Sequence, residues 1–322
     1  MSTRVALGFD VGGTTIKAGV VAWDGISAHV VTECQQATES LRSVHDLLAW
    51  IAQQCEQWRS HYPPVEAVGI GFPACIEWES GVVAVPPNIH WWPDVPFPLR
   101  TALSERLSLP VALDNDANVA AHAECLLGYG QQWPWFLFVT LGTGVGGAVV
   151  ADGRIFRGER GFAGELGHMV INANAPLRSP VFRTGVLEEY VGRAAIVERT
   201  KALLADDPSS ALHGVALDVE AIGRAAEAGD RSARRALEDV GRMLALGLAS
   251  ALAVLGLERV VVGGGISGLP SRFYEQVSEL LRQHAIPAIA ERVTVVRTAV
   301  GPLAGILGAA LLALGVQKEN QQ

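Results

Sequence analysis

The stretch LGFDVGGTTIKAGVV, at residues 7–21, decides the fold because it reads as a strand, a tight turn and a second strand. Glycines let a backbone approach a ligand closely, and successive N–H groups beside threonine hydroxyls suit phosphate oxygens. Asp10 on the first strand can hold Mg²⁺, which prefers oxygen ligands. The sequence therefore predicts a phosphate-binding turn that contains Asp10, Gly12, Gly13, Thr14, Thr15 and Lys17. The alternative is a β-hairpin with a plain Gly-Gly turn.

A second copy of this pattern follows later in the chain. Thr15 corresponds to Thr143, Gly19 to Gly147 and Asp24 to Asp152, each 128 positions further on. Such self-similarity indicates an internal duplication of one strand-turn-strand unit. It predicts a second phosphate-binding turn that contains Thr143 and Gly144. Chance similarity between two hairpins is the alternative.

The composition indicates an ordered globular protein, since 49% of the 322 residues are hydrophobic and 18% are charged. This length suits two domains. The net charge of -8 argues against a nucleic-acid partner, which needs a basic face. The 4 cysteines are scattered without a C-x-x-C pair, so we expect reduced thiols rather than a disulfide framework or a metal cluster.

No targeting or membrane segment is expected. The first strand follows Met1 almost at once, which leaves no room for a signal peptide. Two apolar stretches, residues 243–257 and 302–316, fall short of the roughly 20 residues that a spanning helix needs. We therefore expect a cytoplasmic protein without a membrane partner, in which these helices are buried or lie at an interface.

Strands and helices alternate along the chain, which predicts a mixed α/β sheet in each half. The apolar patterns predict strands at residues 28–32, 67–72, 110–113, 135–141, 148–151, 259–262 and 293–298. They predict helices at residues 40–58, 99–107, 119–127, 187–204, 218–228, 231–257 and 270–284.

An acidic and amide cluster, Asp114-Asn115-Asp116-Ala117-Asn118, lies between an expected strand and an expected helix, where α/β proteins place ligand sites. A carboxylate there can accept a proton from a substrate hydroxyl that attacks phosphorus. We choose Asp116 for this role, because it is nearest to the helix start and Asn115 beside it can hold a sugar hydroxyl. Capping of the helix is the alternative.

Other candidates for the sugar are polar residues in turns and loops. Glu165 and His168 share the turn Gly164-Glu165-Leu166-Gly167-His168, and their side chains can accept hydrogen bonds from hydroxyls. Either Glu188 or Glu189 can serve the substrate as well, and the sequence does not choose between them. Asn88 and His90 lie in a loop rich in tryptophan. Plain surface turns and tryptophan packing are the alternatives for these residues.

With these pieces in order, the chain resembles the ROK family of sugar kinases and repressors. The resemblance is carried by Asp10-Val11-Gly12-Gly13-Thr14, Asn88, Asn115-Asp116-Ala117-Asn118, Leu141-Gly142-Thr143-Gly144-Val145-Gly146-Gly147, Gly164-Glu165-Leu166-Gly167-His168 and Val262-Gly263-Gly264-Gly265-Ile266-Ser267. It implies a two-lobed actin-like ATPase (ribonuclease H-like) α/β fold with mixed sheets and a central cleft for Mg-ATP and a hexose. Residues 1–118 and the helix at 302–316 would form the small lobe, and residues 119–301 the large one.

The resemblance also assigns roles. Asp116 would be the general base for the 6-hydroxyl of the sugar. The sugar would be held by Asn88, Asn115, Asp116, Glu165, His168 and Glu188, and Gly264 and Gly265 would lie near adenosine. The implied activity is that of a glucokinase that works as a homodimer or a higher homo-oligomer. Alternatives are kinases of N-acetylmannosamine, N-acetylglucosamine or fructose, and the family leaves open whether polyphosphate can replace ATP.

One departure concerns zinc. Most family members carry three cysteines after the Gly-His turn that bind zinc together with the histidine, whereas residues 173–187 of this chain contain no cysteine. His168 alone cannot supply the four ligands of a structural site, so we expect no structural zinc. A repressor is a further alternative, but we expect no DNA-binding domain, because the phosphate turn starts about ten residues from Met1. A non-catalytic sugar sensor is opposed by the presence of Asp10 and Asp116.

Overall fold

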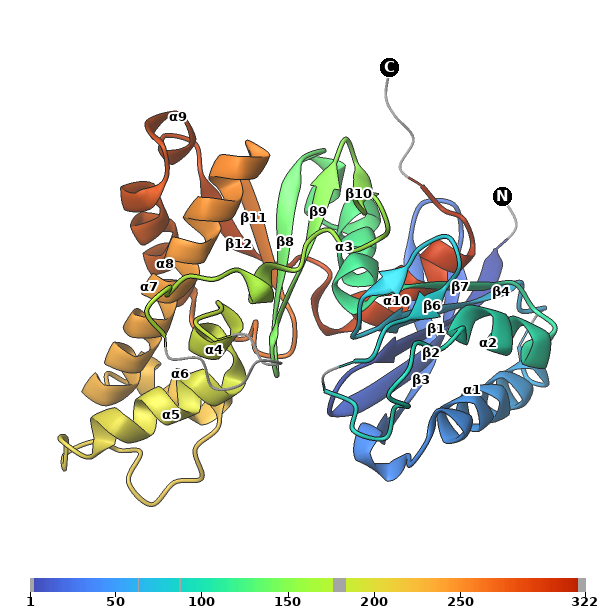
Figure 1. Ribbon diagram of the computed structural model, residues 1–322, viewed down its shortest axis with the longest axis horizontal. Helices are drawn as coiled ribbons and strands as arrows, with labels where there is room; N and C mark the ends of the chain where they lie inside the picture. The colour runs from blue at the N-terminus through green and yellow to red at the C-terminus, as the bar shows by residue number, and fades with distance from the viewer. Residues whose placement is uncertain (1–2, 63, 87, 176–183, 318–322) are drawn as a thin grey trace. The chain divides into compact units, whose positions relative to one another are not determined.

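The computed structural model describes residues 3–62, 64–86, 88–175 and 184–317, and the chain divides into two compact units (Figure 1). The first unit contains Met1–Trp135, Ala148–Gly164 and Ala299–Gln322, and the second contains Phe136–Gly147 and Glu165–Thr298. The division expected at residue 118 falls inside helix α3 (Asp116–Leu127). The whole of α3 belongs to the first unit, because it packs against α10 (Ala304–Ala313).

The first sheet has five strands in the order β3-β2-β1-β4-β7. These strands are β1 (Arg4–Val11), β2 (Thr15–Trp23), β3 (Ala28–Ala37), β4 (Ala67–Phe72) and β7 (Val111–Asn115). The pairs β3–β2 and β2–β1 are antiparallel, whereas the pairs β1–β4 and β4–β7 are parallel. Two short strands, β5 (Ile76–Glu77) and β6 (Val82–Val83), pair in the loop that the sequence reading left without structure.

The second sheet repeats this plan in the order β10-β9-β8-β11-β12. Its strands are β8 (Phe136–Leu141), β9 (Val145–Ala151), β10 (Arg154–Phe156), β11 (Arg259–Gly263) and β12 (Thr294–Arg297). Again a meander of antiparallel strands is followed by two parallel strands. The hairpins β1–β2 and β8–β9 hold equivalent places in the two sheets, which confirms the predicted duplication.

Most of the remaining helices follow the expected pattern with small shifts, and the short helix at residues 287–290 was not predicted. They are α1 (Val44–Arg59), α2 (Leu99–Leu107), α4 (Glu188–Val191), α5 (Arg193–Leu204), α6 (Val219–Glu227), α7 (Arg231–Leu255), α8 (Ser271–His284) and α9 (Pro287–Ala290). The single helix predicted over 187–204 is wrong, because the chain breaks at Gly192 into α4 and α5. A Cβ atom at Gly192 would lie only 2.9 Å from the carbonyl oxygen of Thr143. The break between α4 and α5 therefore packs against the second glycine turn.

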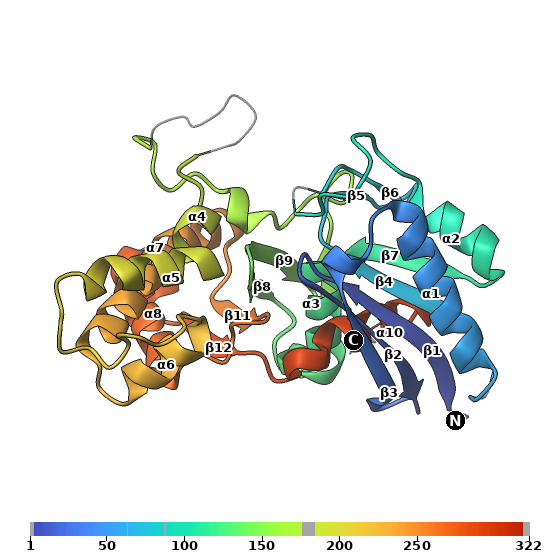
Figure 2. The ribbon, with the colours of Figure 1, turned by 90° about the horizontal axis from the view of Figure 1, so that it is seen from below.

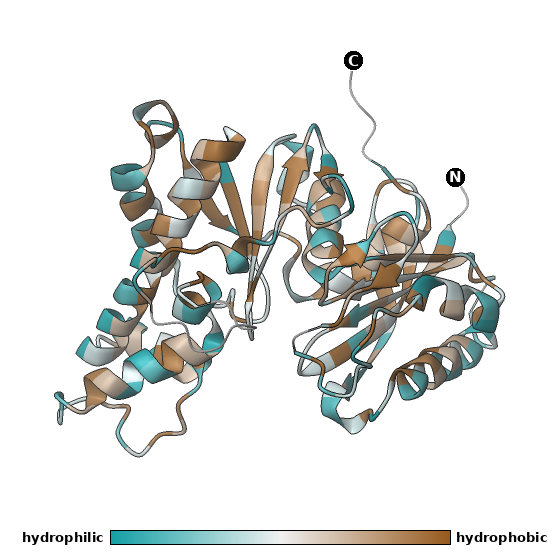
Figure 3. Ribbon diagram, viewed as in Figure 1, coloured by the Kyte–Doolittle hydropathy of each residue, from teal (hydrophilic) through white to brown (hydrophobic). Residues whose placement is uncertain are grey.

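One face of the first sheet is covered by α1. Ser43 caps this helix by accepting a hydrogen bond from the backbone N–H of Asp46, and α1 turns its apolar stripe toward β1. Phe9 is fully buried there, with its ring centroid 5.9 Å from that of Trp50 and 6.2 Å from that of Trp58. Figure 3 shows the resulting contrast between the brown strands and the teal outer side of α1.

The other face is covered by α10, which lies directly on the backbone of the strands (Figure 2). A Cβ atom at Gly8 would collide with the carbonyl oxygen of Ile306, and one at Gly69 would collide with that of Ala309. Gly308 allows equally close approach to the backbone of α3. The glycines of β1 and β4 therefore let the backbone of α10 rest directly on these two strands.

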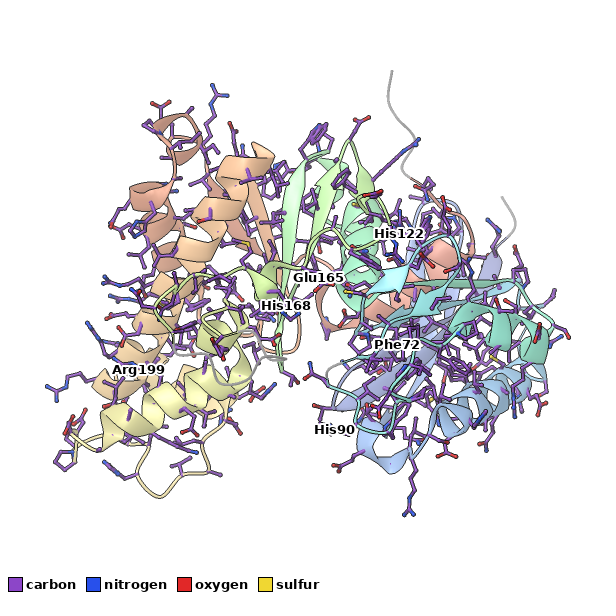
Figure 4. The ribbon with its side chains drawn as sticks, in the orientation of Figure 1. Phe72, His90, His122, Glu165, His168 and Arg199 are labelled. Atoms are coloured by element: carbon purple, nitrogen blue, oxygen red, sulfur yellow. The ribbon has the colours of Figure 1, made fainter. Side chains whose placement is uncertain are left out.

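Helix α3 carries buried polar side chains. His122 is only 5% exposed, and its Nε2 atom has no hydrogen-bond partner among the described residues. Figure 4 labels this histidine beside the red helix α10. Burial and the positive charge of Arg157 lower the pKa of His122 from 6.5 to about 4, against a hydrogen bond to the backbone of Val316 that acts the other way. The imidazole is therefore neutral in the folded protein at neutral pH.

Two further observations concern the cysteines and the apolar helices within the described part of the chain. All four cysteines there are free, and Cys55 and Cys125 are buried. None of the described helices is both long enough and apolar enough to span a bilayer.

The packing of α10 predicts that Gly69→Ala lowers the free energy of unfolding by about 3 kcal/mol or more, since the added methyl has no room against a backbone oxygen. Urea unfolding measures the change. The matched control is Gly268→Ala, where an added Cβ would meet no described atom within 4 Å. Equal stability of the two variants would contradict the close packing.

The neutral state of His122 predicts a loss of stability in acid. The unfolded chain takes up a proton near pH 6.5 and the folded chain only near pH 4, so the contribution of His122 is complete above 6.5 and disappears between 6.5 and 4. The full linkage amounts to about 3 kcal/mol. Urea unfolding across this range should show a shallower loss for His122→Gln than for wild type. The exposed control His284→Gln should follow wild type, and a parallel loss in His122→Gln would refute the assignment.

Candidate functional site

The parallel strands of the first unit place the predicted carboxylates in one row. Asp10 on β1 pairs with Gly71 on β4, and Gly71 pairs with Asp114 on β7. Strand β4 lies between the two acids, and neighbouring strands are about 4.8 Å apart. Asp10 and Asp114 are therefore separated by two strand spacings. Asp116 begins α3 directly after β7, and a Cβ atom at Gly71 would lie 3.4 Å from the Asp116 Cα. The site of the first unit is therefore built on the carboxyl ends of parallel strands.

Asp10 lies against the N-terminal turn of α10. A Cβ atom at Gly305 would collide with the Asp10 carboxylate, so this glycine makes room for the acid at the positive end of the helix. The packed protein atoms raise the pKa of Asp10, while the ammonium of Lys17, its partner across the hairpin, acts in the opposite direction. A carboxylate that has lost water in this way suits a hard cation such as Mg²⁺, which takes one or two carboxylates together with phosphate oxygens and water.

The first glycine turn is held in shape by Thr38, a residue that the sequence reading missed. The Gly12 N–H donates to the Thr15 carbonyl oxygen at 3.0 Å. The Thr38 hydroxyl donates to the Gly12 carbonyl at 2.7 Å, and the Thr38 N–H donates to the Thr14 carbonyl at 2.9 Å. The Trp91 indole N–H donates in turn to the Thr38 carbonyl at 3.0 Å. The phosphate turn is thus braced from two sides.

The tryptophan-rich loop also brings Asn88 to the same turn. A Cβ atom at Gly13 would lie 3.4 Å from the Asn88 Cβ, so the predicted sugar ligand adjoins the predicted phosphate turn. Asn88 and His90 are both exposed (His90 is labelled in Figure 4). Trp92 is buried between the rings of Phe72 and Phe97, at centroid distances of 4.9 and 5.9 Å. Tryptophan packing therefore accounts for Trp92, whereas Asn88 and His90 are exposed candidates for a ligand.

The acidic and amide cluster at the end of β7 contains a helix cap, a buried acid and a partly exposed acid. Asn115 caps α3, because its side-chain oxygen accepts from the Ala117 and Asn118 N–H groups, at 2.9 and 3.4 Å. Its amide nitrogen donates to the Ala74 carbonyl at 3.3 Å. Asp114 is buried in a network with Arg157, whereas Asp116 is partly exposed at the first position of the helix. Of the two acids, Asp116 is thus the one that can meet a ligand.

The second glycine turn, in the second unit, is held by Glu188. The Glu188 carboxylate accepts from the Val145 N–H at 3.0 Å and lies over Gly144, where a Cβ atom would collide with it. The Arg193 N–H, at the start of α5, donates to the Gly142 carbonyl at 3.0 Å. Glu189 has a different task, since it accepts from the Gly185 N–H at 2.6 Å and holds the preceding loop. The geometry therefore separates the two glutamates that the sequence left equivalent.

The glycines after β11 adjoin this second turn. Gly264 has a φ of +90° and lies so close to the Leu141 carbonyl that a side chain would not fit. The Ile266 N–H donates to the same carbonyl at 3.0 Å. Gly264 and Gly265 are exposed, as is Thr143. The second glycine turn, expected to bind phosphates, thus lies beside the two glycines expected near adenosine.

Glu165 and His168 come together in the same unit on the 3₁₀ turn η3 (Leu166–His168). The Glu165 Oε2 and the His168 Nε2 are 3.9 Å apart, and the side chains are 36% and 44% exposed (Figure 4). Gly167 in this turn packs on the Val145 carbonyl, and the Leu187 N–H donates to the Met169 carbonyl at 2.9 Å. The backbone of Val145 therefore contacts both η3 and Glu188, which links the turn that carries His168 to the third predicted sugar ligand of this unit.

Metal ligands are sparse in the described residues, which contain no group of three or more His, Cys, Asp or Glu side chains able to hold an ion. Part of the stretch that carries zinc ligands in other members, residues 176–183, lies outside the described residues. The absence of structural zinc stays a prediction.

The comparisons with known proteins agree with the motifs. The model of the ROK family matches residues 6–316. A glucokinase from Halalkalibacterium halodurans is 31% identical over 330 aligned positions, which cover 99% of this chain and 97% of the relative. An N-acetyl-D-glucosamine kinase from Mannheimia succiniciproducens is 29% identical, with 95% of this chain and 98% of that protein covered.

A solved structure gives the same answer for the fold. The crystal structure of a ROK family glucokinase from Streptomyces griseus, in complex with glucose and AMPPNP, matches with a TM-score of 0.84 at 29% identity. The match covers 97% of this chain and 100% of that one. The two equivalent sheets are those of the actin-like ATPase fold, as expected. Because the family model and the relatives span nearly the whole sequence, this chain belongs to the ROK family.

Proposed function

We propose that this protein transfers the γ-phosphate of ATP to the 6-hydroxyl of a hexose, with glucose as the substrate. The observation that carries the proposal is the row across the first sheet, which sets Asp10 and the Asp116 helix start at the ends of parallel strands one strand apart. A metal-binding acid and a proton-accepting acid are the two carboxylates that phosphoryl transfer to an alcohol requires. The glucokinase relatives support glucose as the acceptor.

Asp116 acts as the general base. Its carboxylate accepts the proton of the 6-hydroxyl while the oxygen attacks phosphorus, a contribution of roughly 10²–10⁴-fold to the rate. Asn88 and Asn115 of the first unit, together with Glu165, His168 and Glu188 of the second, bind the other hydroxyls. Holding the attacking oxygen in line with the phosphate lowers the barrier further, because the entropy of alignment is lost on binding rather than in the transition state.

The two glycine turns bind the phosphates of ATP. Gly12, Gly13, Thr14, Thr15 and Lys17 serve in the first unit, Thr143 and Gly144 in the second, and Gly264 and Gly265 lie beside adenosine. Asp10 holds Mg²⁺, which when bound supplies charge neutralisation to the phosphates.

A second candidate acceptor is N-acetylglucosamine, which the relative from Mannheimia favours. N-acetylmannosamine and fructose complete the set of acceptors to be compared. We further propose that the enzyme works in the cytoplasm as a homodimer or a higher homo-oligomer, and that packing against Val145 replaces zinc in orienting His168.

The proposal predicts ADP release with Mg-ATP and glucose, at a higher kcat/KM than with N-acetylglucosamine, N-acetylmannosamine or fructose. A coupled assay over these sugars measures it. Preference for an N-acetylated sugar would move the assignment to the second candidate. If calorimetry shows sugar binding but none of these sugars supports ATP turnover, the result would favour a non-catalytic sugar sensor.

The role of Asp116 predicts that Asp116→Asn folds, binds glucose within a few-fold of wild type, and loses 10²-fold or more in kcat, because the amide cannot accept the proton. Calorimetry and the same coupled assay give the two quantities. Asp94→Asn, an exposed acid of the same unit, is the matched control and should keep full turnover. Wild-type turnover in Asp116→Asn would remove Asp116 from this role.

A further inference from the structure

Asp114 is a buried carboxylate surrounded by donors. Its side chain is 4% exposed, and it accepts from the Arg157 Nε at 2.9 Å and pairs with the Arg157 Nη2 at 2.8 Å. It also accepts from the Asn118 side-chain amide at 2.9 Å and the Asn115 N–H at 2.8 Å. Burial raises the pKa of Asp114, and the Arg157 charge is the largest influence in the opposite direction. The arginine therefore favours the ionised form of this acid against the effect of burial.

Arg157 is itself fixed in place. Its guanidinium carbon lies 3.6 Å from the ring centroid of Trp78, a cation–π contact, and the side chain is only 20% exposed. The backbone N–H of Trp78 donates to the Arg160 carbonyl at 3.0 Å, which connects the loop after β10 to the β5–β6 hairpin. The guanidinium is thus held between an indole face and the Asp114 carboxylate.

Besides Arg157, the partners of Asp114 lie at the junction that carries Asp116. Asn115 is the N-cap of α3, and Asn118 belongs to its first turn. The carboxylate of Asp114 therefore fixes the backbone on both sides of Asp116 without touching a ligand. A displacement of about 1 Å in a reacting group can cost 10²-fold in rate, so the rigidity of this junction bears directly on a base at its centre.

Stabilisation of the fold alone does not account well for this network. Well-packed apolar residues usually stabilise a protein as well as a buried ion pair does, or better. Asn118 Oδ1 of this network, and His122 Nε2 one turn further along α3, are buried without a partner among the described residues, and each such atom is unfavourable. Buried charges and unsatisfied buried polar atoms of this kind occur mainly where function requires them.

We propose that Arg157 is a positioning residue for Asp116, which it orients through the buried carboxylate of Asp114. The inference rests on the proposed function, since it assumes that Asp116 is the base. Loss of the guanidinium frees the strand-to-helix junction to move, and the transfer step slows while binding of glucose and ATP persists. Arg157 and Asp114 act together, so replacing either residue should lower kcat about as much as replacing both.

The test compares Arg157→Met, Asp114→Asn and the double variant in the intact protein, with turnover corrected for the folded fraction. We expect Arg157→Met to lose 10- to 100-fold in kcat, with KM for glucose and Mg-ATP changed less than 3-fold. Arg157→Lys, which keeps the charge but not the two-pronged geometry, should recover part of the loss. The double variant should be no slower than Arg157→Met, because Asp114→Asn removes the uncompensated buried charge.

The control is Arg160→Met, which breaks the exposed pair between Arg160 and Glu77 in the same loop and should leave kcat unchanged. A kcat of Arg157→Met within 2-fold of wild type overturns the proposal. Multiplicative losses in the double variant also overturn it, because independent residues behave in that way. If Arg157→Met does not fold, Arg157→Lys decides, and wild-type kcat there has the same meaning. Failure of the proposed function is recognised separately, by turnover in Asp116→Asn.

Discussion

The alignment of three parallel strands is the constraint on which the rest of the first unit depends. Their register sets Asp10, Gly71 and Asp114 in one row, so the phosphate turn after β1 and the helix start after β7 share an edge of the sheet. A side chain at the central position would collide with Val119 of α3. The glycine between the two acids is therefore what lets the candidate base approach the phosphate turn.

In the same unit, glycines on the sheet face covered by α10, and in α10 itself, allow very close packing. Gly8, Gly69, Gly305 and Gly308 let α10 touch strand backbone, the Asp10 carboxylate and α3. Close packing of this kind transmits small displacements rather than absorbing them. Buried polar contacts of Thr38 and Arg157 then fix the two ends of the row. In the second unit, Glu188 and Gly264 brace the duplicated turn in a different way, so the duplication preserved the strand plan while the supporting contacts diverged.

Local patterns predicted much of this architecture. The bounds of β4 and α2 agree with the sequence reading, because apolar runs and helical periodicity are properties of neighbouring residues. Asp116 could be selected because it follows a strand and begins a helix. The partner of Asp114 could not be found, since Arg157 lies 43 residues away and only the folded chain brings the two together. Thr38 and the break at Gly192 were missed for the same reason: their contacts are with distant backbone atoms.

The central claim is that an alcohol on the sugar attacks the terminal phosphate of ATP with Asp116 as its proton acceptor. Phosphorus NMR of the wild-type protein incubated with glucose, ATP and Mg²⁺ tests it most directly. The account predicts ADP and a phosphate monoester coupled to the protons on carbon 6 of glucose, in equal amounts. ADP accompanied by free phosphate, or a phosphate on the anomeric carbon, would contradict it.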